Sequence, residues 1–464
     1  MAPSRLLDVV NPFTQTVIDR VETDDAASLE VKVARAAAFY REHPLGLPLD
    51  VRVGVLERLR LLLRRDFDDL CVTAVTEGGK PLRDTRVEVE RAIAGVGSAL
   101  ATLGAWAPTR VRLETVSGAH VEAMSERRPL GVVAALSAFN HPLNLLVHQA
   151  VPALATGCPV IVKPSEKVPR TALQLEALVR EAGCPEGAWQ TVVTPDVGLA
   201  QALACDRRVA FVSFIGSARV GWALRSRLPP GTRCALEHGG VAPAVLLDDV
   251  DVEVAVKKVV RGAFAHAGQV CISTKRLIVP RALRVQVLES LQGEVQRLVT
   301  GDPARDETDV GPLIRPSEAE RIDAWVQGAV TKGGALVAGG KRVGPSGYLP
   351  TLVADAPLDS RLWTEEAFGP VLAVRAYDTP DEAVALASHA DFAFQSAVFG
   401  RDLARCRAFA SRLPGSTVMV NEHTAFRTDE MPFAGLSQSG LGVGGIPYTM
   451  HDFTYERRTV EPLG

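Results

Sequence analysis

The chain has 464 residues, of which 47% are hydrophobic and 23% charged, and its formal net charge is −3. This composition is that of a globular protein with two or three domains, and it excludes an intrinsically disordered chain or a small disulfide-stapled one. The near-neutral charge gives no sign of a nucleic-acid or acidic-membrane partner. Seven cysteines without a CxxC pair indicate a reducing compartment, and the N-terminus lacks the apolar segment of a secretory signal. We therefore expect a cytosolic protein without a membrane span or a metal site.

The first informative elements are a predicted hairpin and a predicted helix. Residues 111–124 contain two strand-like stretches around Ser117-Gly118, which is typical of a hairpin. Residues 140–157 predict a helix, with Pro142 in the first turn and Gly157 at its end. Four polar residues of this segment are spaced to share one helix face, which is either solvated or turned toward a cavity: Asn140, His141, Asn144 and His148.

Strand-length apolar runs and helical patterns alternate through the middle of the chain. Strands are expected at 160–162, 209–215, 245–247 and 276–279, and helices at 171–182 and 220–228. Alternation of this kind indicates an α/β fold with a mostly parallel sheet. At the C-terminus, residues 453–460 suggest a lone edge strand, for which a neighbouring subunit is a natural partner.

Two residues have the chemistry of an enzyme site but are weak evidence on their own. Cys271 lies in AHAGQVCISTKR, and a lone cysteine is usually a small buried hydrophobe. Glu237 lies in ALEHGG, and a lone glutamate is usually a surface charge. Their function therefore depends on their joint context.

That context resembles the aldehyde dehydrogenase superfamily. EHGG is similar to the family's ELGG box and GQVC to its nucleophile box, with Glu237 and Cys271 separated by 271 − 237 = 34 residues. Six further boxes follow the family's order over nearly the whole chain: EGGKPL (77–82), SAFNHPL (137–143), IVKPSEKVP (161–169), SFIGS (213–217), EEAFGPV (365–371) and PFAGLSQSGLG (432–442).

The resemblance implies an aldehyde dehydrogenase fold. A Rossmann-like NAD(P)-binding domain is expected at 1–107 and 127–237, and an α/β catalytic domain at 238–438. A small β oligomerisation arm is expected at 108–126 and 446–464, giving a homodimer or homotetramer.

The resemblance also implies the catalytic roles. Cys271 attacks the aldehyde carbon as a thiolate and forms a thiohemiacetal, which hydride transfer converts to a thioester. The side-chain amide of Asn140 and the backbone N–H of Cys271 stabilise the oxyanion. Glu237 acts as the general base that activates water, and its presence favours hydrolysis to a free acid over transfer to coenzyme A.

The implied cofactor is NAD or NADP. Lys163, Ser165 and Glu166 correspond to the adenosine-ribose site, and a carboxylate there favours NAD because it repels a 2′-phosphate. Gly216 and Ser217 correspond to the pyrophosphate site at a helix N-terminus. Glu366 and Phe368 correspond to the nicotinamide-ribose site.

The expected substrate is a short polar or anionic aldehyde. Arg427 suits a carboxylate, sulfonate or phosphonate, and the FRTDEMP segment (426–432) resembles lactaldehyde, succinate-semialdehyde and phosphonoacetaldehyde dehydrogenases. The positions that correspond to the family's substrate pocket are His141, Asn144, His148, Val270, Ile272, Arg427 and Phe433.

The chain departs from the family's boxes at several positions. Ile215 replaces a threonine, and His238 replaces a leucine, with a side chain that we expect to point outward. Ser437 replaces a lysine, and Val443-Gly444 replaces an Arg-Glu pair, which we expect to alter local packing but not the catalytic pair.

Two alternatives to this function remain. One is a specialised biosynthetic member of the family with an unusual aldehyde as its substrate. The other is a catalytically silent, ligand-binding relative, although retention of Asn140, Glu237, Cys271 and Glu366 together argues against it.

Overall fold

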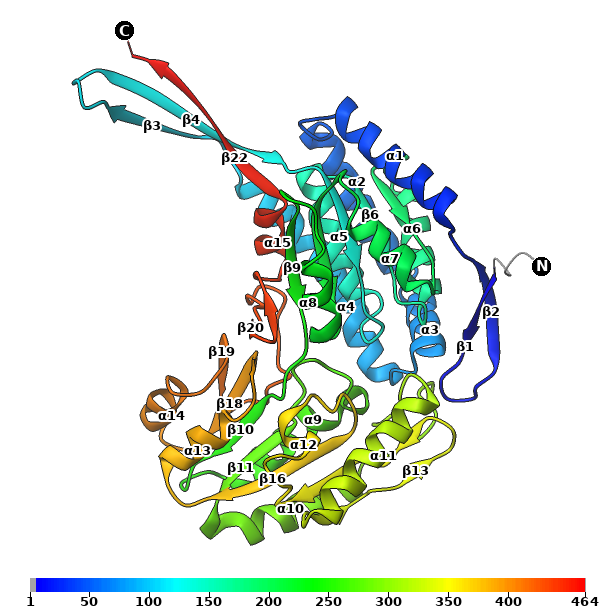
Figure 1. Cartoon of the computed structure of the whole chain (residues 1–464), viewed down its shortest axis with the longest axis vertical. Helices are drawn as coiled ribbons and strands as arrows, with labels where there is room; N and C mark the ends of the chain where they lie inside the picture. The colour runs from blue at the N-terminus through cyan, green and yellow to red at the C-terminus, as the bar shows by residue number, and fades with distance from the viewer. Residues whose placement is uncertain (1–5, 464) are drawn as a thin grey trace.

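The computed structural model describes residues 6–463, and two large sheets organise the chain (Figure 1). The first sheet has six strands in the order β21-β9-β8-β5-β6-β7, parallel except for β21. Its strands are β5 (Val132–Leu136), β6 (Val160–Lys163), β7 (Trp189–Thr191), β8 (Val209–Ile215), β9 (Arg233–Glu237) and β21 (Gly440–Leu441).

Helices cover both faces of this first sheet because its central strands are apolar on both sides. All five residues of β5 are buried, and they alternate between two separate hydrophobic clusters. On one face pack α2 (Leu49–Arg65), α3 (Phe67–Gly78), α4 (Leu82–Ala105), α5 (Asn144–Thr156), α6 (Pro169–Glu181) and α15 (Ile446–Asp452). On the other pack α1 (Ala26–Glu42), α7 (Val197–Ala204) and α8 (Ala218–Arg225).

The second sheet has seven strands in the order β12-β15-β16-β11-β10-β18-β19, parallel except for β12. Its strands are β10 (Pro243–Leu246), β11 (Arg276–Pro280), β12 (Ala335–Ala338), β15 (Thr351–Ala354), β16 (Val371–Tyr377), β18 (Gln395–Phe399) and β19 (Thr417–Val420). The helices of this half are α9 (Val252–Phe264), α10 (Arg284–Gln296), α11 (Pro316–Thr331), α12 (Arg361–Thr364), α13 (Pro380–Ala387) and α14 (Leu403–Ala410). Two hairpins are formed by consecutive short strands, β1 (Leu6–Val10) with β2 (Val17–Glu22) and β13 (Arg342–Val343) with β14 (Gly347–Tyr348). A further antiparallel pair joins two strands that are distant in the sequence, β17 (Phe392–Ala393) and β20 (Leu436–Ser437).

The predicted helix at 140–157 begins later than expected. Helix α5 starts at Asn144, so Asn140 and His141 lie in the loop that follows β5. The Glu88 carboxylate of α4 accepts from the backbone N–H groups of Leu143 (2.9 Å) and Asn144 (3.1 Å), and thereby caps the helix at this point. The predicted C-terminal end is confirmed, because Gly157 adopts a left-handed conformation with φ 88°.

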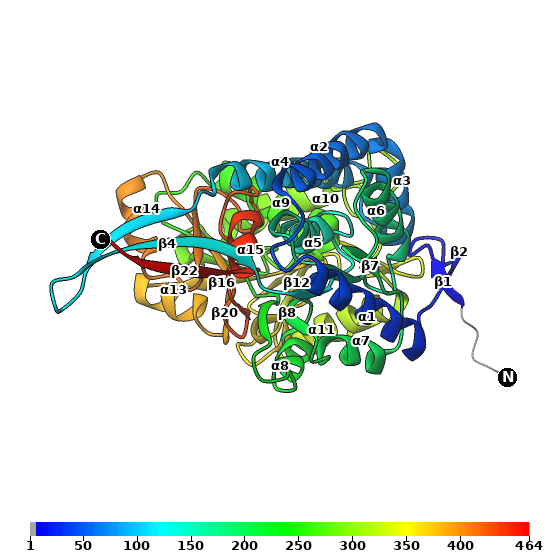
Figure 2. The ribbon, with the colours of Figure 1, turned by 90° about the horizontal axis from the view of Figure 1, so that it is seen from above.

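Three antiparallel strands project from the body of the molecule as an arm (Figures 1 and 2). The predicted hairpin is confirmed as β3 (Thr109–Glu114) and β4 (His120–Pro129). Contact of the C-terminal strand with a neighbouring subunit stays a prediction, but the strand is not alone as expected, because β22 (Thr454–Pro462) pairs along its whole length with β4 of its own chain. Its backbone groups are therefore satisfied within the molecule on that side.

The domain boundaries predicted from the resemblance remain predictions. Within the segment expected to form the arm, α15 instead packs on α4 and α5, with Ile446 and Met450 fully buried. Within residues 6–463, no helix has the length and apolar character that a membrane span requires.

Candidate active site

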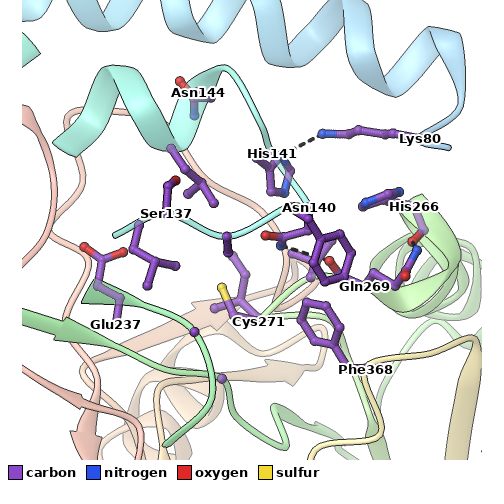
Figure 3. Close-up of a pocket in the computed structure, with 18 of the residues that line it drawn as sticks. Lys80, Ser137, Asn140, His141, Asn144, Glu237, His266, Gln269, Cys271 and Phe368 are labelled. Atoms are coloured by element: carbon purple, nitrogen blue, oxygen red, sulfur yellow. Dashed lines mark hydrogen bonds between the residues drawn. The ribbon is translucent and has the colours of Figure 1, made fainter. Parts of the chain in front are cut away.

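A single cavity of about 620 Å³ lies where the two sheets meet, and all the predicted site residues line it. Figure 3 shows its centre, with Asn140 next to Cys271 and with Glu237 on the neighbouring wall. The lining includes the predicted catalytic residues Cys271, Glu237 and Asn140, the predicted cofactor residues Lys163, Ser165, Glu166, Gly216, Ser217, Glu366 and Phe368, and the predicted substrate residues His141, Asn144, His148, Val270, Ile272, Arg427 and Phe433.

Cys271 lies on a tightly fixed loop between α9 and β11. The 3₁₀ turn before it, Ala265–Gly268, contains left-handed residues at His266 (φ 50°) and Ala267 (φ 53°). Such a conformation is strained for residues other than glycine and persists only where the surroundings enforce it. Two residues after the cysteine, the Ser273 hydroxyl lies 3.0 Å from the carbonyl oxygens of both Gly262 and Ala263 at the end of α9.

Asn140 is held beside this loop by one of its two amide protons. Its Nδ2 donates to the carbonyl oxygen of Gln269 at 2.9 Å, which leaves the second N–H of the amide for a ligand. Gln269 is itself fixed, since its amide donates to His266 and Pro312 carbonyls and accepts from the Ile314 N–H. Sequence reasoning gave Gln269 no role, although the glutamine of the GQVC box was the available signal.

Glu237 is the last residue of β9, and its carboxyl group enters the cavity. Burial raises its pKa to about 7, an effect that the nearby Arg427 guanidinium partly opposes. A Cβ at Gly444 would lie 2.1 Å from Glu237 Oε1, so only glycine leaves room for the carboxylate in this position. Gly444 therefore packs directly against Glu237, a contact that the sequence did not indicate, and the expectation that the catalytic pair is intact stays a prediction.

The Cys271 thiol is strongly disposed to keep its proton. Burial raises its pKa above the usual range, and the negative charges of Glu366 and Glu237 raise it further. The resting thiol thus needs a base to become a nucleophile, and Glu237 lines the same cavity.

The other end of the cavity has features that fit a dinucleotide. Gly216 and Ser217 join β8 to the N-terminus of α8, where backbone N–H groups favour a pyrophosphate. Lys163 ends β6, and burial lowers the pKa of its ammonium group. The carboxylate of Glu366 lies against Gly239, where a Cβ would be 1.9 Å away, and its buried Oε1 has no partner among the described residues. Phe368 is held at φ 44° with its ring edge-on to Phe139 at 5.8 Å.

His238 does not point outward as expected. Its side chain is buried, and its Nδ1 donates to the carbonyl oxygen of Gln438 at 2.9 Å. The ring packs edge-on against Trp222 of α8, and a Cβ at Gly221 would lie 2.0 Å from its Nε2. The imidazole therefore fills a notch under α8. Burial lowers the pKa of His238, which favours its neutral form.

Arg427 supplies a half-buried cation near the catalytic residues. Its guanidinium carbon lies 4.1 Å from the centre of the Phe433 ring, and burial lowers its pKa to about 10. Its Nη1 is buried without a hydrogen-bond partner among the described residues. Next to it, Asp429 accepts from Arg91 of α4 (2.7 Å) and lies 2.9 Å from the His148 Nε2. Arg91 lines the cavity too, and a lone arginine within a long amphipathic helix had given no signal in the sequence.

The comparison with known proteins identifies the family. The model described as "Aldehyde dehydrogenase family" matches residues 1–459. The chain belongs to the aldehyde dehydrogenase family. It is therefore an oxidoreductase that acts on aldehydes with NAD(P).

Several relatives resemble this aldehyde dehydrogenase over almost its whole length. A 3-sulfolactaldehyde dehydrogenase of Priestia aryabhattai is 34% identical over 453 residues, which cover 97% of this chain and 94% of that protein. The structure of glyceraldehyde-3-phosphate dehydrogenase GapN from Methanocaldococcus jannaschii, complexed with NADP, matches with a TM-score of 0.94 and 29% identity, covering 98% of this chain and 99% of the other. Aldehyde dehydrogenase 21 from Physcomitrella patens, in complex with the reaction product succinate, matches with a TM-score of 0.95 and 30% identity, covering 100% and 96%.

Proposed function

We propose that this protein oxidises a short, anionic aldehyde to a carboxylic acid through a covalent intermediate on Cys271. The observation that carries the substrate class is the Arg427 guanidinium, which lines the same cavity as Cys271 and has a buried, unpartnered Nη1. A half-buried cation with a free, buried donor atom favours an anionic ligand group.

The chemical steps follow from the three residues around the cavity. Glu237 takes the proton of the Cys271 thiol, and the sulfur forms a bond to the aldehyde carbon while the carbonyl electron pair moves to oxygen. The free N–H of Asn140 and the backbone N–H of Cys271 stabilise that oxyanion, and one such donor typically lowers the barrier by about 2.7–4 kcal/mol.

NAD(P)⁺, when bound, supplies the hydride acceptor that converts the thiohemiacetal to a thioester. We propose that Glu366 and Phe368 orient its nicotinamide ribose, that Gly216 and Ser217 hold its pyrophosphate, and that Lys163, Ser165 and Glu166 hold its adenosine ribose. Glu237 first releases to solvent the proton that it took from the thiol, and then removes a proton from water. The water oxygen attacks the thioester carbon, the C–S bond breaks, and the leaving thiolate takes the proton back from Glu237, so that the Cys271 thiol and the free acid are formed.

The relatives support an anionic substrate of this kind. One is named for a sulfonated aldehyde and another was crystallised with a dicarboxylate product. Arg427 and the adjacent Arg91 match such charges here, and Asp429 neutralises only part of their combined positive charge. The carboxylate of Glu166 favours NAD over NADP, because it repels a 2′-phosphate. We also propose that the enzyme acts in the cytosol and forms a homo-oligomer through its β arm.

Substitution of the arginine tests the substrate class. We expect Arg427→Ala to lower kcat/KM for succinate semialdehyde about 10- to 100-fold more than kcat/KM for butanal, because only the acid loses a charged hydrogen bond. The control is Arg407→Ala, which removes an exposed guanidinium on α14. An equal loss for both aldehydes, or no loss for either, would contradict the proposal.

A further inference from the structure

A buried chain of charges ends at the residue next to Asn140. The Nζ of Lys80 donates to Glu88 Oε2 at 2.9 Å and lies 2.6 Å from Nδ1 of His141. Lys80 and Glu88 are both almost fully buried. Because an ammonium group only donates, His141 Nδ1 must accept, and the single proton of its neutral ring is therefore on Nε2.

The imidazole of His141 remains neutral in this environment. Burial lowers the pKa of His141 well below its usual value, and the positive charge of Lys80 lowers it further. The His141 side chain is 19% exposed and lines the cavity, and no described residue accepts a hydrogen bond from its Nε2. His141 thus offers the cavity a neutral N–H donor.

An unpartnered acceptor lies one turn along the chain. Asn144, the first residue of α5, is only 3% exposed and lines the same cavity. Its buried Oδ1 has no hydrogen-bond partner among the described residues. Figure 3 shows Asn144 at the start of α5 and His141 in the loop before it, with Asn140 between His141 and Cys271. A buried acceptor of this kind normally has a partner, and a ligand can supply it.

We propose that His141 and Asn144 form a subsite for a hydroxyl group on the carbon next to the aldehyde carbon. The hydroxyl oxygen accepts from His141 Nε2–H, and its proton is donated to Asn144 Oδ1. One donor and one acceptor from the same cavity wall match a hydroxyl, whereas the lone pairs of the Asn144 oxygen repel an anion. The position follows from the chain, since His141 directly follows the residue that binds the carbonyl oxygen. This inference rests on the proposed function and extends it to 2-hydroxy aldehydes.

The remaining members of the chain have a positioning role. Glu88 already caps α5 and orients Lys80, and Lys80 fixes the tautomer of His141. A purely structural role for Lys80 would not depend on which ring occupies position 141. This difference makes the two roles separable by experiment.

The test compares kcat/KM for 2-hydroxypropanal and propanal in each variant. Their ratio is independent of the fraction of protein that is folded, because both substrates are measured on the same sample. We expect His141→Phe and Asn144→Ala each to lower the wild-type ratio about 10-fold, since a substrate hydroxyl then loses one buried partner. We expect Lys80→Met to lower the ratio in the wild-type background but not in the His141→Phe background.

Arg427→Ala separates this inference from the proposed function. Neither 2-hydroxypropanal nor propanal is an anion. We therefore expect Arg427→Ala to leave the ratio of their kcat/KM values unchanged while it lowers activity with succinate semialdehyde. The hydroxyl subsite would be overturned if the wild-type ratio of kcat/KM were near one, or if neither His141→Phe nor Asn144→Ala lowered that ratio. Neither result would affect the assignment of Arg427. An effect of Lys80→Met that is equal in both backgrounds would overturn its positioning role.

Discussion

The carboxyl group of Glu237 illustrates how a single environment sets a reaction's pH range. Burial raises its pKa to about 7, so the carboxyl is largely protonated below that pH and cannot accept a proton from water. We therefore expect kcat for acid formation to rise with pH through about 7 and then to level off. A pH profile of kcat measures this, and the profile of Glu237→Gln should lack the inflection. An inflection that persists in Glu237→Gln would assign the titration to another group.

Among single residues, those inside a motif were predictable and those that act through distant partners were not. Cys271 and Asn140 were predicted because each lies in a short motif of consecutive residues. Arg91 was missed because its partner Asp429 lies 338 positions away, and only the fold brings them together. The inward position of His238 was missed for the same reason, since the notch that receives it is formed by Gly221 on another element.

At the scale of elements, a buried lysine joins the two loops that carry the nucleophile and Glu366. Lys275 Nζ donates to the carbonyl oxygens of Gly268 and, at 3.1 Å, of Gly369. The two loops touch, because a Cβ at Gly268 would lie 2.2 Å from Gly369 O. The ammonium thereby satisfies two buried carbonyl groups at the point where the loops meet.

Removal of this ammonium should affect both loops together. We expect Lys275→Met to reduce the free energy of unfolding by about 2–4 kcal/mol, because two buried carbonyls lose their donor. We also expect a lower kcat and a higher KM for the cofactor in the folded enzyme. Chemical denaturation and steady-state kinetics measure these effects, with the exposed Lys332→Met as the control. An unchanged kcat and cofactor KM would show that the contact does not position the loops.

The elements themselves were predicted in kind but not in their partners. Apolar alternation identified strands such as β8, whose predicted and observed bounds agree at Val209–Ile215. The same pattern does not say where a strand pairs, so the pairing of the C-terminal strand with β4 of its own chain was not predicted from it. The start of α5 was misplaced because Glu88, from a different helix, supplies the cap.

At the scale of the whole molecule, the site exists because the edges of two sheets face each other. Asn140 follows β5 and Glu237 ends β9, both at the carboxyl edge of the six-stranded sheet. Cys271 precedes β11 and Glu366 precedes β16, both at the amino edge of the seven-stranded sheet. Composition and periodicity predicted the α/β class but not this junction, which came only from the resemblance of the motifs to a known family. The oligomeric role of the β arm remains a prediction.

At this junction, the Cys271 sulfur and the Glu237 carboxylate act on the same substrate, one as nucleophile and the other as base. Glu237→Gln should form the thioester only on long incubation, because the thiol lacks its base, and should then hydrolyse it slowly, because the amide cannot activate water. Mass spectrometry of Glu237→Gln after incubation with succinate semialdehyde and NAD⁺ is the most direct measurement. We expect the mass of one acyl group on the peptide that contains Cys271, and none on Cys271→Ala. An acyl group on a different residue, or turnover by Cys271→Ala at the wild-type rate, would contradict the account.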